Sequence, residues 1–400
     1  MKVLVFTWEY PPHIDGGLGE HIKGLLPALM QASQTLELHV LTPTFDGQAR
    51  TDHLEQLYVH WVAVDKPADQ HIYRDVLRGN GALVATAQEV VAAHGPFDLL
   101  HVHDWLPSFA ARAVADQLQI PLLATIHATE RGRYGGALYS DLSRGIDAAE
   151  IQLAQRAELV IACSDAMQHE VHHFFHVPWE KIVVVPNGIN AEPLLKLQNK
   201  DLADFRAQYA LPYEQIVFNV GRLVYEKGAD LLVEAAPHIL HRNPNAKFII
   251  GGRGPLYAFL EQRIHALHLS HKILLAGFLS DDVRDQLYVA ADVCVFPSRY
   301  EPFGIVALEA MAAGTPVVAS AVGGLGSVVQ HEYTGLTTYV GDVYSLAWAV
   351  TRTFDDPAAA VVRAARAEQM VQTELTWPVI ANHTLAVYRQ VAKETSPVFA

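Results

Sequence analysis

Short apolar stretches alternate with helical segments from one end of the chain to the other. The apolar runs predict strands at residues 3–6, 38–41, 58–64, 99–103, 122–126, 159–162 and 182–185, and then at 216–220, 248–250, 273–276, 293–296, 317–319 and 335–338. Strands that are apolar throughout are buried on both faces, so their alternation with helices indicates parallel sheets covered by helices on each side. The predicted fold class is therefore α/β, with doubly wound Rossmann-like sheets.

The strands are too numerous for one sheet, and their series restarts after a polar stretch. Residues 190–213 carry few apolar runs, and strand-like sequence resumes at residue 216. We therefore predict an N-terminal domain over residues 1–190, a second domain over 191–375, and a final helical segment over 376–400. Two such domains facing each other would leave a cleft, which is the usual place for a ligand.

Residues 296–320 form the most informative stretch, with the pattern strand, loop, helix, strand. A loop with Glu301 follows the strand, a helix begins at Ile305, and Gly314 ends that helix. In such units ligands bind over the helix N-terminus, where the amides of Phe303 and Gly304 would face an anion such as a diphosphate.

Two glutamates flank these amides, and each has two interpretations. Glu301 and Glu309 are either solvated helix residues or two sides of one polar pocket. If the interval were all helix, the two would be separated by about 12 Å. The carboxyl groups of glycosidases lie about 5 to 9.5 Å apart. The estimate favours contacts with two different ligand groups over joint action on one scissile bond.

Glycine and basic residues follow other predicted strands. Gly16, Gly17 and Gly19 precede a helix, either to let a phosphate approach the backbone or simply to make a tight turn. The spacing is not that of a dinucleotide fingerprint, which disfavours a dehydrogenase. In the second half, Arg222 and Lys227 follow a strand and suit a diphosphate, with Arg as a fork and Lys as a point charge.

Polar residues also cluster where strands of the first half end. His101 and His103 share a strand face and, with Asp104, could form a metal trio, although a strand-end polar cluster is the favoured interpretation. His127 ends the next strand, beside a loop that holds Glu130. It either touches a polar substrate or is a core histidine.

The bulk composition narrows the class of protein. The 400 residues carry a formal charge of −14, which argues against nucleic acid and anionic membranes as main partners. The two cysteines, Cys163 and Cys294, lie in apolar runs and are predicted to be buried free thiols, as suits a cytoplasmic protein. We predict neither a secretory signal nor a transmembrane segment. The sequence does not predict the oligomeric state.

Together these motifs resemble retaining glycosyltransferases of family four. The resemblance rests on Gly-Arg-Leu-x4-Lys-Gly at 221–228, Gly-Gly-Arg-Gly-Pro at 251–255, and above all Glu-Pro-Phe-Gly at 301–304 with the second glutamate at 309. His127 and Val-Pro-Asn-Gly-Ile at 185–189 are similar to the same group. The resemblance implies the glycosyltransferase B architecture, with a final helix that crosses back to the first domain.

The family's pattern, carried over residue by residue, implies a role for each motif. Arg222 and Lys227 would bind the donor diphosphate and stabilise the leaving nucleotide, while Glu301 would lie by the donor sugar. The amides of Phe303, Gly304 and Ile305 would bind sugar hydroxyls and phosphate, and Glu309 would hydrogen-bond the ribose. His127 would lie near the reaction centre, and Gly16 and Gly17 would contact the phosphates. We find no Asp-x-Asp motif at a strand end, and therefore expect neither a metal nor another cofactor.

The first loop also resembles the start of glycogen and starch synthases, except that Ile14 stands where those enzymes carry a lysine. The resemblance implies transfer of glucose from UDP-glucose or ADP-glucose to a glucan or other saccharide acceptor, with Glu9, Asp104 and Glu130 as possible sugar contacts. Transfer of mannose or another hexose to a small or lipid-linked acceptor, a phosphorylase, an epimerase and a non-catalytic sugar-nucleotide-binding protein are the alternatives. The helix over 20–30 has one lysine, so strong membrane association is not expected.

Overall fold

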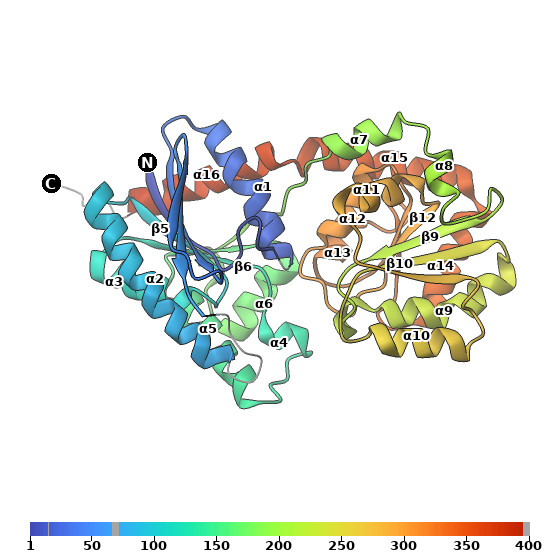
Figure 1. Ribbon diagram of the computed structural model, residues 1–400, viewed down its shortest axis with the longest axis horizontal. Helices are drawn as coiled ribbons and strands as arrows, with labels where there is room; N and C mark the ends of the chain where they lie inside the picture. The colour runs from blue at the N-terminus through green and yellow to red at the C-terminus, as the bar shows by residue number, and fades with distance from the viewer. Residues whose placement is uncertain (15, 66–71, 395–400) are drawn as a thin grey trace. The chain divides into compact units, whose positions relative to one another are not determined.

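The computed structural model describes residues 1–14, 16–65 and 72–394, with side chains up to residue 392 (Figure 1). The chain divides into two compact units. Unit 1 comprises Met1–Gly188 and Trp377–Ala400, and unit 2 comprises Ile189–Thr376. Each unit is built on a largely parallel sheet with helices on both faces, which confirms the predicted fold class.

The sheet of unit 1 has eight strands in the order β3-β4-β2-β1-β5-β6-β7-β8. Their bounds are β1 Lys2–Phe6, β2 Glu37–Thr44, β3 Arg50–Leu54, β4 Leu57–Ala63, β5 Leu99–His103, β6 Leu122–Ile126, β7 Leu159–Ala162 and β8 Ile182–Val184. All pairs are parallel except β3 with β4. The sequence did not predict β3, because all five of its residues are exposed and it has no apolar face.

Helices cover both faces of this sheet (Figure 1). One face packs against α1 (Gly17–Ala32) and α16 (Trp377–Glu394), which share a core with β1, β2 and β4. The other face carries α2 (Ile72–His94), α3 (Ser108–Leu118), α5 (Asp141–Arg156) and α6 (Asp165–Phe175). Two shorter turns, α4 (Glu130–Arg133) and η2 (Trp179–Lys181), follow β6 and α6.

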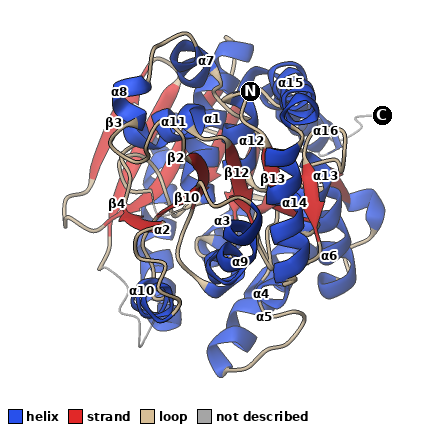
Figure 2. Ribbon diagram, turned by 90° about the vertical axis from the view of Figure 1, so that its right-hand side faces the viewer, coloured by secondary structure: helices blue, strands red, loops and turns tan. Residues whose placement is uncertain are grey.

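The sheet of unit 2 has six parallel strands in the order β11-β10-β9-β12-β13-β14. Their bounds are β9 Gln215–Val220, β10 Ala246–Gly251, β11 Ile273–Gly277, β12 Val293–Phe296, β13 Val317–Ser320 and β14 Leu336–Thr338. Figure 2 distinguishes these strands from the helices around them. The chain leaves the middle of the sheet in both directions, at β9 and β12, which is the topological switch point where doubly wound sheets bind ligands.

The helices of unit 2 also form two layers. One layer consists of α9 (Ala229–Arg242), α10 (Tyr257–Ala266) and α14 (Val343–Asp355). The other consists of α7 (Glu192–Gln198), α11 (Asp281–Ala290), α12 (Ile305–Ala312) and α15 (Pro357–Glu374). The shorter elements are α8 (Ala203–Arg206), η3 (Tyr225–Lys227) and α13 (Gly323–Val328). No helix among the described residues is long and apolar enough to span a bilayer.

The contact between α1 and α16 holds the last helix on unit 1. At Gly24, in the middle of α1, an added Cβ would lie 2.0 Å from Cε2 of Trp377, the first residue of α16. Trp377 is nearly buried, so its ring has little room to move. The two helices therefore pack at a distance that only glycine allows.

We predict that Gly24→Ala destabilises unit 1. Alanine favours helix by about 1 kcal/mol over glycine, but forcing a methyl group against a packed ring costs about 1–3 kcal/mol. Thermal or urea unfolding should therefore show a lower midpoint. Gly81→Ala, in α2, is the matched control, because a Cβ there meets no atom within 4 Å and should raise the midpoint. Equal gains from both substitutions would contradict the described packing of α16.

Candidate functional site

The loops that follow the central strands of unit 2 are packed backbone against backbone. A Cβ on Gly228 would lie 2.0 Å from the carbonyl oxygen of Pro297, which follows β12. A Cβ on Gly252 would lie 1.8 Å from the carbonyl oxygen of Gly221, which follows β9. Both glycines also have positive φ angles, of 69° and 135°. Both the lack of space for a Cβ and the backbone conformation therefore require glycine at these two positions. The close packing that results brings the ends of β9, β10 and β12 together.

A buried ion pair lies at this junction. Nζ of Lys227 is 2.6 Å from Oε2 of Glu301, whose side chain is only 8% exposed. Ser298 donates a further, longer hydrogen bond of 3.4 Å to the same oxygen. An ammonium group has three donors, so Lys227 keeps donors for another acceptor. The structure thus brings together two of the predicted site residues that lie 74 positions apart in the chain.

Arg222 occupies the same loop as Lys227, directly after β9 and Gly221. Its side chain is exposed. Among the residues that the structure describes, the Arg222 guanidinium has neither a hydrogen bond nor an ion pair. An unpaired guanidinium in a loop with a partly buried lysine is suited to bind an anion with two or more oxygens.

The helix α12 begins beside Glu301. Gly304 caps it with a φ of +101°, a conformation that favours glycine, and offers no side chain to the first turn. The amides of Gly304, Ile305 and Val306 have no carbonyl partner within the helix, as at any helix start. Phe303 is buried, and the Glu301 carbonyl accepts a hydrogen bond from the Gly324 amide. The amides of the first turn of α12 therefore lie at this strand end, and their contact with a phosphate or sugar stays a prediction.

Glu309, in the middle of α12, contacts residues of the neighbouring helix α11. Its Oε2 accepts a 2.7 Å hydrogen bond from the hydroxyl of Tyr288, and its Oε1 is 3.7 Å from Arg284. Burial, followed by the nearby Glu309 charge, raises the pKa of the Tyr288 hydroxyl, so this hydroxyl stays protonated and donates. Glu309 is thus oriented by α11, a pairing that the sequence did not reveal.

In unit 1, the glycine turn before α1 is closed by a carboxylate. Oε2 of Glu9 accepts hydrogen bonds from the amides of Gly16, at 3.1 Å, and Gly19, at 3.0 Å. A Cβ on Gly19 would lie 2.7 Å from the same oxygen. Glu9 therefore occupies the position of an anion at the start of α1, and Gly17 is the first residue of that helix. The predicted sugar contact by Glu9 and phosphate contact by Gly16 stay predictions.

Three histidines lie along the ends of β5 and β6. His101 is buried and uses both ring nitrogens, Nδ1 with the Tyr388 hydroxyl and Nε2 with Thr125. Nδ1 of His103 is 3.1 Å from Nε2 of His127. Burial lowers the pKa of His127 to about 3, so its ring is neutral at pH 7. His127 can therefore donate or accept a hydrogen bond there, but it is not a cation.

A fourth histidine, which the sequence did not single out, joins this group from α1. Nδ1 of His21 is 2.7 Å from Oδ1 of Asn187, and its ring centroid is 4.6 Å from that of His127. His21 lies one helical turn after the glycine motif, on the side of the strand ends. That position, together with Asn187 in the turn before residue 190, is the signal that could have identified it.

The two remaining predicted acid contacts hold loops in place. Oδ1 of Asp104 accepts a 2.7 Å hydrogen bond from the His127 amide, and burial raises the pKa of Asp104 to about 7 against the opposing effects of that hydrogen bond and of Arg133. Glu130 is buried and accepts a 2.8 Å hydrogen bond from the Ser143 hydroxyl. Asp104 thus fixes the backbone of His127, and Glu130 joins α4 to α5.

Two family descriptions match the chain, one in each half. The description "Glycosyltransferase Family 4" matches residues 15–193, and "Glycosyl transferases group 1" matches residues 203–370. Arg222, Lys227, Glu301 and Glu309 all fall within the second match, whereas His127 falls within the first.

Individual relatives cover nearly the whole chain. An uncharacterized glycosyltransferase of Methanocaldococcus jannaschii is 37% identical over 97% of this chain and 98% of its own. The glycogen synthase of Mycobacterium tuberculosis is 33% identical over 97% of this chain and 94% of its own. The structure of sucrose-phosphate synthase from Thermosynechococcus elongatus superposes with a TM-score of 0.83 at 26% identity, over 98% of this chain and 100% of that one. The chain therefore belongs to glycosyltransferase family 4, with the glycosyltransferase B fold and a likeness to glycogen and starch synthases.

Proposed function

We propose that this glycosyltransferase is a retaining hexosyltransferase that moves glucose from UDP-glucose or ADP-glucose to a glucan or another saccharide acceptor. The observation that carries the proposal is the Lys227–Glu301 pair, 2.6 Å apart at the ends of β9 and β12. The similarity to a glycogen synthase and a sucrose-phosphate synthase supports glucose as the sugar, because both products named contain glucose units.

Residues of unit 2 would supply the charge that the reaction needs. As the bond between the sugar and the diphosphate breaks, its electron pair passes to the diphosphate oxygen. Arg222, Lys227 and the first amides of α12 would stabilise that charge, because donors that are already oriented need little reorganisation during the reaction. The acceptor hydroxyl would form the new bond on the face from which the diphosphate leaves, and its proton would pass to the departing diphosphate.

These groups would also replace a divalent ion at the diphosphate. Two side-chain cations and a helix N-terminus provide the positive charge that Mg²⁺ supplies in other nucleotide sites. The proposed chemistry therefore requires no metal and no cofactor. The alternatives, another hexose donor or a non-catalytic sugar-nucleotide-binding protein, would be recognised by the donor and turnover measurements below.

The first prediction concerns the donor. A ligand that binds only the folded state raises the melting temperature, so UDP-glucose or ADP-glucose should stabilise the protein more than GDP-mannose does. The Glu309→Gln variant should lose part of that shift, since the resemblance places Glu309 on the ribose. A larger shift with GDP-mannose would replace glucose by mannose in the proposal. No shift with any nucleotide sugar would contradict it.

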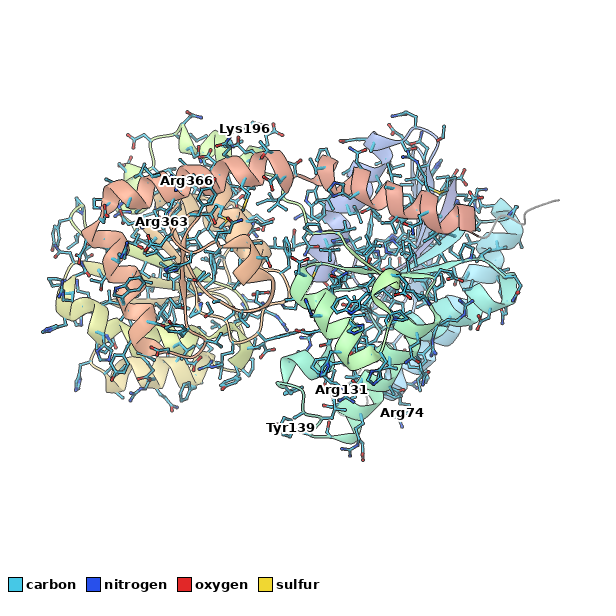
Figure 3. All side chains as sticks on the ribbon, turned by 180° about the vertical axis from the view of Figure 1, so that it is seen from behind. Arg74, Arg131, Tyr139, Lys196, Arg363 and Arg366 are labelled. Carbon is cyan, nitrogen blue, oxygen red and sulfur yellow. The ribbon has the colours of Figure 1, made fainter. Side chains whose placement is uncertain are left out.

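The second prediction concerns Lys227. Lys227→Met should lower kcat by about 100-fold or more, because an oriented charge on the leaving group is lost. The control is Lys196→Met, on the exposed side of α7 (Figure 3), which should leave kcat unchanged. EDTA should leave the activity of the wild-type enzyme intact, and complete loss would show that a metal takes part.

Loss of Lys227 also leaves the buried Glu301 carboxylate without its cation, which by itself destabilises a protein. The double variant Lys227→Met/Glu301→Gln removes that unpaired charge. It should recover the melting temperature of the wild type but not its kcat. Recovery of kcat would show that Lys227 acts only on the stability of the loop.

A further inference from the structure

Histidines 21, 103 and 127 of unit 1 form a group with the composition of a metal site. Each ring offers one nitrogen, and these three nitrogens lie within 4.8 Å of one another. His21 comes from α1, His103 ends β5, and His127 follows β6, so three separate elements converge. We propose that this group, the three-histidine cluster, binds a divalent transition ion of the zinc class.

Two ring nitrogens of the cluster are buried without a hydrogen-bond partner. Among the described residues, neither Nε2 of His21 nor Nε2 of His103 has a donor or acceptor in reach, although both atoms are fully buried. Buried polar atoms are nearly always paired, so each orphan requires an explanation such as an ion or a water molecule. Nε2 of His21 is the orphan that an ion shared with His103 and His127 would explain. Imidazole nitrogens are ligands that Zn²⁺, Cu²⁺ and Ni²⁺ share.

The contacts around His21 orient one lone pair. The Asn187 amide oxygen is an acceptor, so Nδ1 of His21 donates to it across 2.7 Å. A neutral imidazole has one N–H and one lone pair, so Nε2 carries the lone pair. In metal-binding histidines the N–H of the other ring nitrogen typically donates a hydrogen bond to an oxygen in this way, which fixes the tautomer and the ring orientation. Asn187 is therefore a positioning residue for this site.

The distance between the other two rings also fits a shared ion. Nδ1 of His103 and Nε2 of His127 are 3.1 Å apart. Two imidazole nitrogens on one tetrahedral zinc are separated by about 3.3 Å, given bond lengths of about 2.0 Å. In this arrangement His103 binds through Nδ1 and keeps its proton on Nε2, so no net proton release is required. The ion then accounts for the orphan Nε2 of His21, whereas Nε2 of His103 is not a ligand. His127 is only half-buried, which leaves the ion a path to the site. Three histidines and one open position form a ligand set that suits zinc. The ion takes no part in the transfer reaction proposed above.

A second group of possible ligands in unit 1 is less suited to a cation. Glu37, His39 and His94 also lie within 4.8 Å of one another. However, the ring nitrogens of His39 are both hydrogen-bonded, to Glu37 and to His60. The Lys2 ammonium, 3.2 Å from the Glu37 carboxylate, would repel an ion there. This group serves as the internal control.

The test is metal binding by the metal-stripped full-length protein, and it does not depend on transferase activity. Titration with Zn²⁺ by calorimetry should show one site per chain, and Co²⁺ should give the intense visible absorption of a tetrahedral complex. His21→Gln and His103→Gln should each weaken binding at least tenfold, and Asn187→Ala should weaken it by about 10- to 100-fold. His94→Gln should bind as the wild type does.

Unchanged binding in His21→Gln and His103→Gln would place the ion elsewhere and overturn the proposal. Absence of binding by the wild type would do the same and assign the orphan nitrogens to water. Should these variants fail to fold, the wild-type protein still decides. One equivalent of Zn²⁺ should shift the imidazole nitrogen resonances of His21, His103 and His127, and shifts confined to His39 and His94 would contradict the proposal.

Discussion

The close approach of backbone segments at the strand ends of unit 2 is the constraint on which its site depends. Gly228 lets its loop lie against the carbonyl of Pro297, and Gly323 lies equally close to the carbonyl of Glu301, where an added Cβ would be 2.1 Å from the oxygen. A side chain at either position would separate the loops after β9, β12 and β13. Lys227 would then no longer reach the Glu301 carboxylate. The glycines therefore determine the ion pair although they carry no functional group.

The sequence predicted the strands well where burial on both faces makes them apolar throughout, as in β5, β6 and β12. It missed β3, an exposed antiparallel edge strand that is held by pairing with β4 alone and needs no apolar face. Parallel topology also let the sequence anticipate that polar residues at strand ends gather at one edge of each sheet. Fold class and the location of the candidate sites therefore follow from the pattern of apolar runs and the polar residues that end them.

The hydrogen-bond partners of those polar residues cannot be predicted from the pattern of apolar runs. His21 and Asn187 are 166 positions apart, and Tyr288 reaches Glu309 from a neighbouring helix. Such pairs depend on how each helix is rotated about its axis and on how far it is shifted along its neighbours. The hydrophobic periodicity of the sequence determines neither. Glu9 illustrates the other limit, because a carboxylate near a glycine turn can contact either a ligand or the turn itself. In this structure the Glu9 carboxylate accepts hydrogen bonds from the amides of the turn.

The polar groups at the strand ends differ between the two units. In unit 2, the Lys227 ammonium and the Glu301 carboxylate lie 2.6 Å apart, and each offsets part of the cost of removing the other from water. In unit 1, burial lowers the pKa of the His127 ring to about 3. At neutral pH the His127 ring is therefore uncharged and can act only through hydrogen bonds or a lone pair.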